Sequence, residues 1–172
     1  ELRFPELEAP FVWLDSFTHA PIEQRTTAYE KACILYNTAA QITRVSMQLN
    51  RSDSSTDALK RAYTGLRQAA GLLQYIKNNF MYAPSDGMKG PALESLSKLL
   101  LAQASEVFLE KSIHDTKGEA LIAKLASHTA HTYSGLSVEW NDTDNLRVPA
   151  MWCRIVACKA DHFMSCLLYT SD

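Results

Sequence analysis

The sequence predicts a layered, mostly α-helical domain of antiparallel helices with one leading β-strand, and three observations lead to that fold class. The 172 residues include only six glycines and six prolines, which gather in short segments between long helix-compatible stretches. Apolar residues in those stretches recur every three to four positions, as the buried face of a helix requires. Residues 11–15 instead alternate apolar and polar side chains, which predicts a strand. Paired long helices of this kind are compatible with diverged, TPR-like helical hairpins.

The first two helices are predicted from their apolar stripes. A helix over about residues 22–49 carries a broad apolar arc, which indicates that it is covered on more than one side. The Ser- and Asp-rich segment that follows is a loop, and it supplies an N-cap at Thr56 or Asp57 for the second helix. The predicted core stripe of this second helix consists of Leu59, Ala62, Leu66, Ala69, Leu73, Ile76 and Phe80.

Three further helices are predicted after a break at residues 82–90. Pro91 suits the first turn of a third helix, a fourth helix spans about residues 116–135, and a fifth follows Pro149. The residues expected to face the core are Leu93, Leu96, Leu100, Ala104 and Val107 on the third helix, Ile122, Ala126, Ala130 and Tyr133 on the fourth, and Trp152, Ile155, Val156, Lys159 and Phe163 on the fifth.

Both ends of the chain are expected to be cut, so that residues 1–172 form a single partial domain, the central portion of a larger one. A lone strand cannot satisfy its own backbone hydrogen-bonding groups, so we expect its partner upstream of Glu1 or in another chain. The last helix is still apolar where the sequence stops. We therefore expect the isolated chain to be prone to aggregation.

Composition excludes several classes of function. Lysine and arginine number 17 against 19 aspartates and glutamates, and the net charge of −2 argues against nucleic acid as the main partner. No apolar run approaches the roughly 20 residues that cross a bilayer, and we expect neither a transmembrane segment nor a signal peptide. The four cysteines match neither zinc-site nor redox-pair spacing, so we expect free, mostly buried thiols in a reducing, cytosolic setting.

The sequence offers little support for catalysis. His128 and His131 lie three residues apart on the fourth helix, and His114 and Asp115 precede it, so a metal-dependent enzyme using these four residues is the alternative from a different class. They lack the Glu-x-x-His pattern, and no phosphate loop or Gly-x-Ser-x-Gly motif is present. Cys33 has no nearby positive residue to activate its thiol. We therefore expect no enzyme, no metal and no cofactor.

Three apolar residues lie off the predicted core stripes. At about 100° per residue, Leu121 and Leu125 project roughly 80 to 120° away from the core face of the fourth helix. They share that side with Lys117 and Lys124, while Phe108 lies roughly 90° off the apolar line of the third helix. Either a neighbouring helix covers these residues, or they form an exposed apolar strip, flanked by lysines, that suits an acidic amphipathic helix.

Several motifs follow one another along the chain. Residues 11–17 are FVWLDSF, residues 29–37 are YEKACILYN, residues 101–111 are LAQASEVFLEK, and residues 159–163 are KADHF. In this order the motifs resemble the BRO1 domain of ESCRT-associated adaptors. The first looks like the strand signature of that family, the second like its Phe-Glu-Lys-Ala…Leu-Phe-Asn helix, and the third like the segment usually written Leu-Ala-Gln-Ala-Gln-Glu.

The resemblance implies a curved domain of helical hairpins with a small N-terminal sheet. It also implies a cytoplasmic adaptor in multivesicular-body sorting, recruited to endosomes, that binds the C-terminal amphipathic helix of the Snf7 (charged multivesicular body protein 4) subunit of ESCRT-III. The binding patch of the family uses one aromatic and two aliphatic residues, which fall here on Phe108, Leu121 and Leu125. Among fungal members, both a vacuolar-sorting adaptor and a PalA-type scaffold of alkaline-pH signalling stay open.

Overall fold

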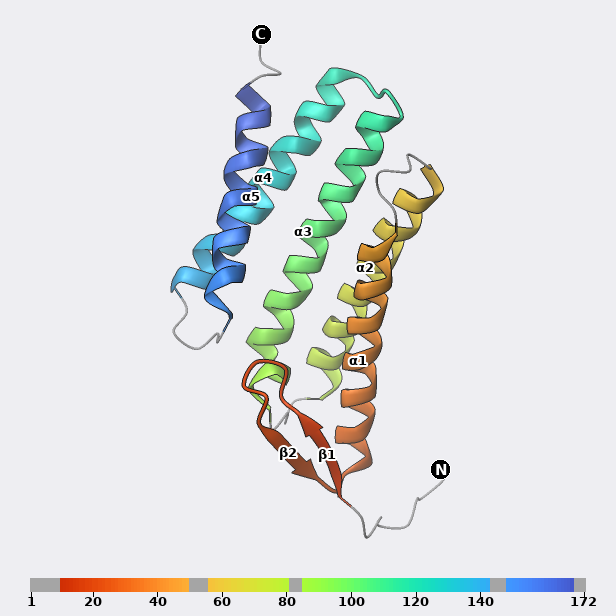
Figure 1. The fold of residues 1–172 in the computed structure, drawn as a ribbon, viewed down its shortest axis with the longest axis vertical. Helices are drawn as coiled ribbons and strands as arrows, with labels where there is room; N and C mark the ends of the chain where they lie inside the picture. The colour runs from red at the N-terminus through yellow and green to blue at the C-terminus, as the bar shows by residue number, and fades with distance from the viewer. Residues whose placement is uncertain (1–9, 50–55, 81–84, 143–147, 169–172) are drawn as a thin grey trace.

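The computed structural model of the protein describes residues 10–49, 56–80, 85–142 and 148–168. A β-hairpin leads into five long helices, as the order of elements in Figure 1 shows. The elements are β1 (Phe11–Leu14), β2 (Pro21–Gln24), α1 (Thr27–Gln48), α2 (Thr56–Asn79), the short 3-10 helix η2 (Asp86–Met88), α3 (Gly90–His114), α4 (Glu119–Asp142) and α5 (Ala150–Leu168).

Each helix packs mainly on its neighbours in the sequence, which makes the molecule an array of helical hairpins. The extensive contacts are those of α1 with α2, α2 with α3, α3 with α4, and α4 with α5. In Figure 1, α1 lies in front of α2 and α5 lies in front of α4, with α3 between the two pairs. The predicted class, a mostly α-helical layered array, is confirmed.

The core consists of two apolar clusters on opposite sides of α3. The first joins α1, α2 and α3 and includes the fully buried side chains of Leu66, Ile76 and Leu93. The second joins α3, α4 and α5 around Ala130 and Tyr133, which are also fully buried. Because α3 gives different faces to the two clusters, its apolar residues are not confined to a single stripe.

The prediction of a lone strand without a partner in this chain is wrong. β2 pairs antiparallel with β1, and Trp13 lies opposite Ile22 in the register. Residues 22–24 of this second strand were predicted to belong to a helix over about residues 22–49. That helix begins only at Thr27, because Thr26 caps it by accepting a hydrogen bond of 3.3 Å from the Tyr29 N–H.

Two predictions about α4 and α5 also need correction. α4 runs to Asp142, about two turns beyond its predicted end. The indole of the buried Trp140 in this extension donates a hydrogen bond to the Ser95 hydroxyl. Trp152 and Ile155 were expected to face the core, yet 39% and 43% of their surfaces are exposed. The physical reason is that α5 packs mainly on α4 and lacks a covering helix on its other side in the described part of the chain.

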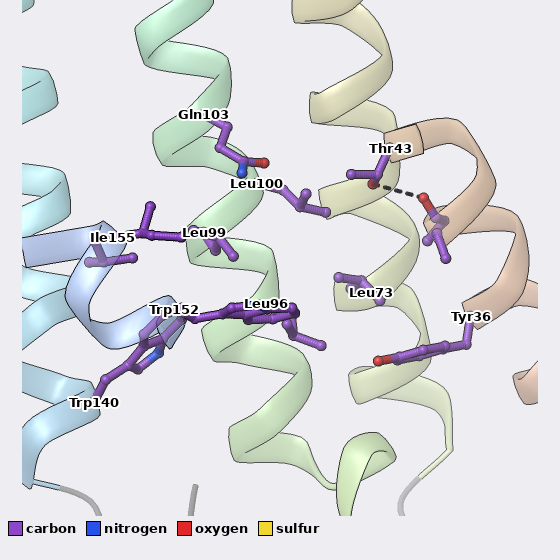
Figure 2. A pocket seen from close by; sticks show the side chains of 13 residues that line it. Tyr36, Thr43, Leu73, Leu96, Leu99, Leu100, Gln103, Trp140, Trp152 and Ile155 are labelled. Atoms are coloured by element: carbon purple, nitrogen blue, oxygen red, sulfur yellow. Dashed lines mark hydrogen bonds between the residues drawn. The ribbon is translucent and has the colours of Figure 1, made fainter. Parts of the chain in front are cut away.

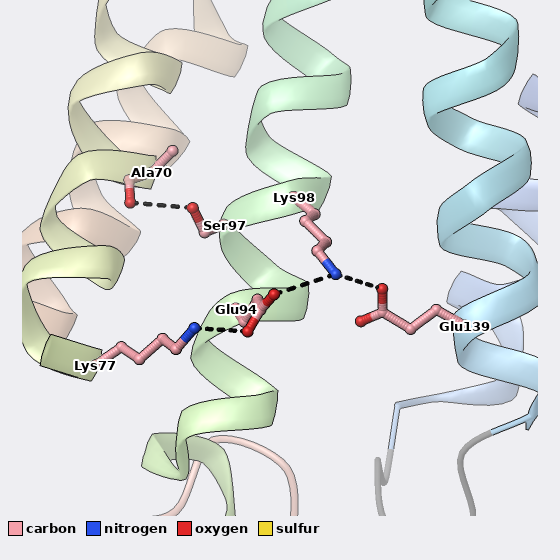
Figure 3. A network of polar contacts seen from close by, with 6 residues as sticks. All are labelled: Ala70, Lys77, Glu94, Ser97, Lys98 and Glu139. Atoms are coloured by element: carbon pink, nitrogen blue, oxygen red, sulfur yellow. Dashed lines mark hydrogen bonds and ion pairs between the residues drawn. The ribbon is translucent and has the colours of Figure 1, made fainter. Parts of the chain in front are cut away.

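A polar network on three helices fixes their relative position (Figure 3). Lys77 of α2 donates to Glu94 of α3 at 2.6 Å, and Lys98 lies 3.3 Å from Glu94 and 2.7 Å from Glu139 of α4. The hydrogen bond from Lys77 is the largest influence that lowers the pKa of Glu94. These groups are partly exposed, so the network contributes more to helix alignment than to stability.

The four cysteines are free, but they are less buried than expected. Cys33 is buried and burial raises the pKa of its thiol, as expected for an unreactive core residue. Cys153 and Cys166 are half-buried, and Cys158 is exposed. None of the described helices has the length and apolar character that a bilayer span requires.

Candidate partner-binding surface

The turn between α3 and α4 determines how Phe108 and Leu125 lie relative to each other along the two helices. The Lys117 N–H donates to the Ser112 carbonyl at 3.0 Å, and Thr116 adopts a left-handed φ of 51°, which ends α3 and reverses the chain within four residues. At 1.5 Å per residue, Phe108 lies about 9 Å before the end of α3, and Leu125 lies about 9 Å after the start of α4. The two residues therefore lie at a similar distance from the turn on adjacent antiparallel helices.

The candidate apolar residues differ in how far they are exposed. Phe108 exposes 39% of its surface and Leu121 exposes 45%, so the described neighbouring helices do not cover them. Leu125 is half-buried and packs against the second core cluster. Lys117 and Lys124 are both exposed. The expectation that Leu125 is not a core residue is therefore only partly right. Part of its side chain packs against the cluster that residues of α3, α4 and α5 form.

A contact with α2 extends this surface beyond the residues found in the sequence. The centroids of the Tyr63 and Phe108 rings lie 5.5 Å apart, and the two ring planes form an angle of 37°. The Arg67 guanidinium donates to the Tyr63 hydroxyl at 3.1 Å and lies 5.4 Å from the centre of its ring. Tyr63 and Arg67 share one face of α2 at a spacing of four residues, but which face meets Phe108 depends on the packing of α2 on α3.

Basic side chains gather around the turn. Lys111 forms an ion pair with Asp115, and the hydrogen bond from Lys111 is the main influence that lowers the pKa of that carboxyl. The charge of Lys117 lowers the pKa of Asp115 further, to a smaller extent. Lys124 follows in the second turn of α4 and is exposed. The turn end of the α3–α4 hairpin thus combines exposed apolar and basic side chains.

The residues of the metal-enzyme alternative do not come together. His114 contacts Asp115, with 3.8 Å between ring Nδ1 and carboxylate Oδ1, but that carboxylate already pairs with Lys111. His128 and His131 are exposed on α4, and His128 lies about 13 Å along the helix from its start. Within the described ranges, no group of three or more His, Cys, Asp or Glu side chains could hold a metal ion.

Comparison with known proteins gives consistent matches over nearly the whole chain. The sequence model of the BRO1-like domain matches residues 1–171. The vacuolar protein-sorting protein bro1 of Aspergillus fumigatus is 37% identical over 173 residues, which cover 98% of this chain and 18% of that protein. The chain thus spans less than a fifth of the length of this relative.

Solved structures agree with the sequence matches. ALIX in complex with the SIVmac239 PYKEVTEDL late domain gives a TM-score of 0.85 at 26% identity, covering 94% of this chain and 24% of that one. The ALIX BRO1 CHMP4C complex gives a TM-score of 0.80 at 26% identity, covering 92% of this chain and 48% of that one. The ordered motifs, the helical-hairpin fold and these matches together assign the 172-residue chain to the BRO1-like domain family.

Proposed function

We propose that this chain is part of a non-enzymatic adaptor of multivesicular-body sorting that binds the C-terminal amphipathic helix of a Snf7-type ESCRT-III subunit. The binding surface consists of Phe108, Leu121 and Leu125, with Lys117 and Lys124 at its rim. The adaptor works in the cytoplasm and reaches endosomes through its partners. Its task is to hold a partner in place, so it needs no reacting group.

The observation that carries the proposal is the pair of exposed apolar side chains, Phe108 and Leu121, beside basic residues at one end of the α3–α4 hairpin. Exposed apolar residues that gather beside charges are typical of a protein-binding site. The solved BRO1 domain of ALIX in a complex with CHMP4C supports the choice of partner. The match to a vacuolar protein-sorting relative favours the vacuolar-sorting alternative over alkaline-pH signalling.

The geometry suggests how such a helix is recognised. Leucine or methionine side chains of the partner would pack between Phe108 and Leu121, against the exposed part of the half-buried Leu125 side chain. Acidic residues beside that apolar face would approach Lys117 and Lys124, which favours association and fixes the orientation of the helix. The aromatic and aliphatic residues therefore supply most of the affinity, and the lysines mainly supply the rate and its salt dependence.

The proposal is tested by titrating a Snf7-type C-terminal peptide into the wild-type chain and into Leu121→Asp. We expect the substitution to remove about 2 kcal/mol of binding or more, roughly a 30-fold rise in Kd, because an ionised carboxylate replaces a central apolar anchor. Because the Leu121 side chain is largely exposed, thermal unfolding should change little. Leu125→Asp is less suitable, since the half-buried Leu125 also supports the second core cluster.

The matched control is Val138→Asp, which places the same charge on the same helix at a residue whose surface is 58% exposed. Val138 lies about 25 Å along α4 from Leu121, so the control should bind the peptide like the wild type. Lys124→Gln should weaken binding less than Leu121→Asp and flatten its dependence on salt. Unchanged binding by a folded Leu121→Asp variant would show that the surface lies elsewhere.

A further inference from the structure

The side of α3 between α2 and α4 carries a stripe of residues that includes Phe108. Glu94 and Lys98 begin this stripe and pair with Lys77 of α2 and Glu139 of α4, which lie on either side of α3 in Figure 3. Phe108 follows Glu94 by fourteen residues, which at about 100° per residue leaves the two side chains only about 40° apart around the helix. This side of α3 is therefore the floor of a surface that α2 and α4 border.

The register between α2 and α3 places Arg67 beside this stripe. Lys77 of α2 pairs with Glu94 of α3, and farther along the two helices the ring centroids of Tyr63 and Phe108 lie 5.5 Å apart. From the first contact to the second, α2 runs back by fourteen residues while α3 advances by fourteen, so the helices are antiparallel with a constant register. Arg67 follows Tyr63 by four residues and is therefore level with a point about 6 Å before Phe108 along α3.

A second exposed apolar residue extends the surface past Arg67. Leu101 precedes Phe108 by seven residues, so the two side chains lie on the same side of α3, about 10 Å apart along the helix. They expose 44% and 39% of their surfaces. Arg67 is exposed and level with the interval between them. An apolar helix face that follows α3 and contacts both residues would therefore pass beside the guanidinium.

Tyr63 holds the Arg67 guanidinium in position. The half-buried Tyr63 side chain packs against the first core cluster, which fixes its ring. Its hydroxyl accepts a hydrogen bond of 3.1 Å from Arg67, whose guanidinium lies 5.4 Å from the ring centre. A guanidinium carries five N–H donors in one plane, and the Tyr63 hydroxyl takes one of them. The remaining donors can pair side by side with both oxygens of a carboxylate.

Two other cations of α2 are paired with carboxylates. Arg61 lies 4.0 Å from Asp57 of the same helix, and Lys77 lies 2.6 Å from a glutamate of α3. Arg67 differs from them, because its hydrogen-bond partner within the described residues is the uncharged Tyr63 hydroxyl. Its charge is therefore available to an acidic group of a partner. A bound partner would also exclude water from the apolar residues beside Arg67, which strengthens such a charge pair.

We propose that Arg67 is a specificity-determining residue of the proposed binding surface and pairs with an acidic side chain of the bound helix. This inference rests on the proposed function and adds a residue of α2 to its site. The partner helix follows α3 and places two apolar residues, seven positions apart, on Phe108 and Leu101. Its acidic residue lies between them in the sequence, on the edge toward α2. Tyr63 is a positioning residue, because it fixes the guanidinium and touches the Phe108 ring.

The first test measures Kd and the rate constants of a Snf7-type C-terminal peptide with the wild-type chain and with Arg67→Gln. The substitution should raise Kd roughly 10-fold, mainly through faster dissociation, because it removes a direct, hydrogen-bonded charge pair. The matched control is Arg61→Gln, which removes the same charge from the same helix about 120° away around its axis and should change Kd less than about twofold. Arg67→Lys keeps the charge but loses the paired donors, so its Kd should lie between those of the wild type and Arg67→Gln.

The second test replaces each acidic residue of the peptide in turn by its amide. One replacement should raise Kd with the wild-type chain by a factor similar to that of Arg67→Gln, and should have little further effect with Arg67→Gln itself, because a direct pair is lost only once. Tyr63→Phe keeps the ring and removes the hydroxyl, so it should raise Kd about 2- to 3-fold. That effect should disappear when Arg67→Gln is also present, which a merely structural role of the hydroxyl would not produce.

The outcomes separate this inference from the proposed function. If Leu121→Asp loses binding but Arg67→Gln binds like the wild type, Arg67 has no such role and the proposed surface stands. The same conclusion follows if no peptide replacement depends on Arg67. Binding that survives Leu121→Asp unchanged would overturn both. Because Arg67 is exposed, Arg67→Gln should keep the Tm of the wild type, and the peptide replacements test the pair in the unaltered chain.

Discussion

At the scale of single residues, Asp15 joins the β-hairpin to the segment before α3. One carboxylate oxygen accepts hydrogen bonds from the N–H groups of Phe17 and Thr18 at 2.9 and 2.8 Å, and the other accepts from the Gly87 N–H at 2.8 Å. Burial by itself would raise the pKa of Asp15, but the hydrogen bonds from Gly87, Thr18 and Phe17 outweigh it and lower the pKa to about 2. The ionised carboxylate is therefore the form that the fold stabilises.

This low pKa predicts how stability depends on acid. The pKa of Asp15 is lower in the folded chain than in the unfolded chain, where it is about 4, so its stabilisation is present above pH 4 and is lost as the pH falls toward 2. The loss should amount to about 2 kcal/mol. Urea unfolding at several pH values should show this loss in the wild type and a smaller one in Asp15→Asn.

The control for the acid prediction is Asp161→Asn, because Asp161 is exposed on α5. At neutral pH, Asp15→Asn should lower the free energy of unfolding by about 1–3 kcal/mol. The amide has only one acceptor oxygen, which is weaker than a carboxylate oxygen, and its NH₂ group cannot accept from the N–H groups that donate to Asp15. Asp161→Asn should change that free energy by less than about 0.5 kcal/mol. Equal pH dependence of the wild type and Asp15→Asn would contradict this account of the hairpin.

At the scale of helices, two glycines of α2 have opposite roles. A Cβ atom added at Gly65 would lie 2.1 Å from the Ser46 hydroxyl oxygen of α1, whereas one added at Gly71 would have no heavy atom within 4 Å. Gly65 therefore permits the close approach of α1 and α2, and Gly71 only lowers helix propensity.

This difference predicts a change of sign between two identical substitutions in one helix. Gly71→Ala should raise the free energy of unfolding by about 0.5–1 kcal/mol through helix propensity. Gly65→Ala should lower it by about 1–3 kcal/mol, because overpacking against Ser46 outweighs that gain. Chemical denaturation of both variants measures the difference. Adding Ser46→Ala to Gly65→Ala should restore most of the loss, and a stabilised Gly65→Ala variant would contradict the close approach.

The helices themselves were predictable, but some of their contacts were not. Periodicity placed Leu66, Leu73 and Ile76 of α2 in the core, and all three are buried, because a helix covered on one side repeats its apolar residues every three to four positions. It also placed Phe108 and Leu121 off the core. It did not find Tyr63, because the partner of an aromatic ring on another helix depends on how the two helices pack.

At the scale of the whole molecule, an apolar trough beside α3 predicts the solution behaviour of the isolated chain. Leu96, Leu99, Trp152 and Ile155 are among the residues that line this trough (Figure 2). A dye that fluoresces on apolar surfaces should bind the folded chain, and Trp152→Gln should reduce that binding without lowering Tm, since the indole is partly exposed. Val138→Gln removes an exposed apolar side chain outside the trough and should change dye binding little. Absence of dye binding, or a large loss of stability in Trp152→Gln, would contradict the trough as an accessible apolar surface.

The sequence by itself determined the number and type of the long helices, the breaks near Pro91 and Pro149, and the position of Phe108 and Leu121 off the core stripes of their own helices. These features depend on periodicity and local backbone preferences, which a single segment carries. The tertiary structure decided the pairing of residues 21–24 with β1, the half-burial of Leu125 and the exposure of Trp152 and Ile155. Those features depend on which distant segment covers each face, and contacts between distant segments are fixed only when the whole chain packs.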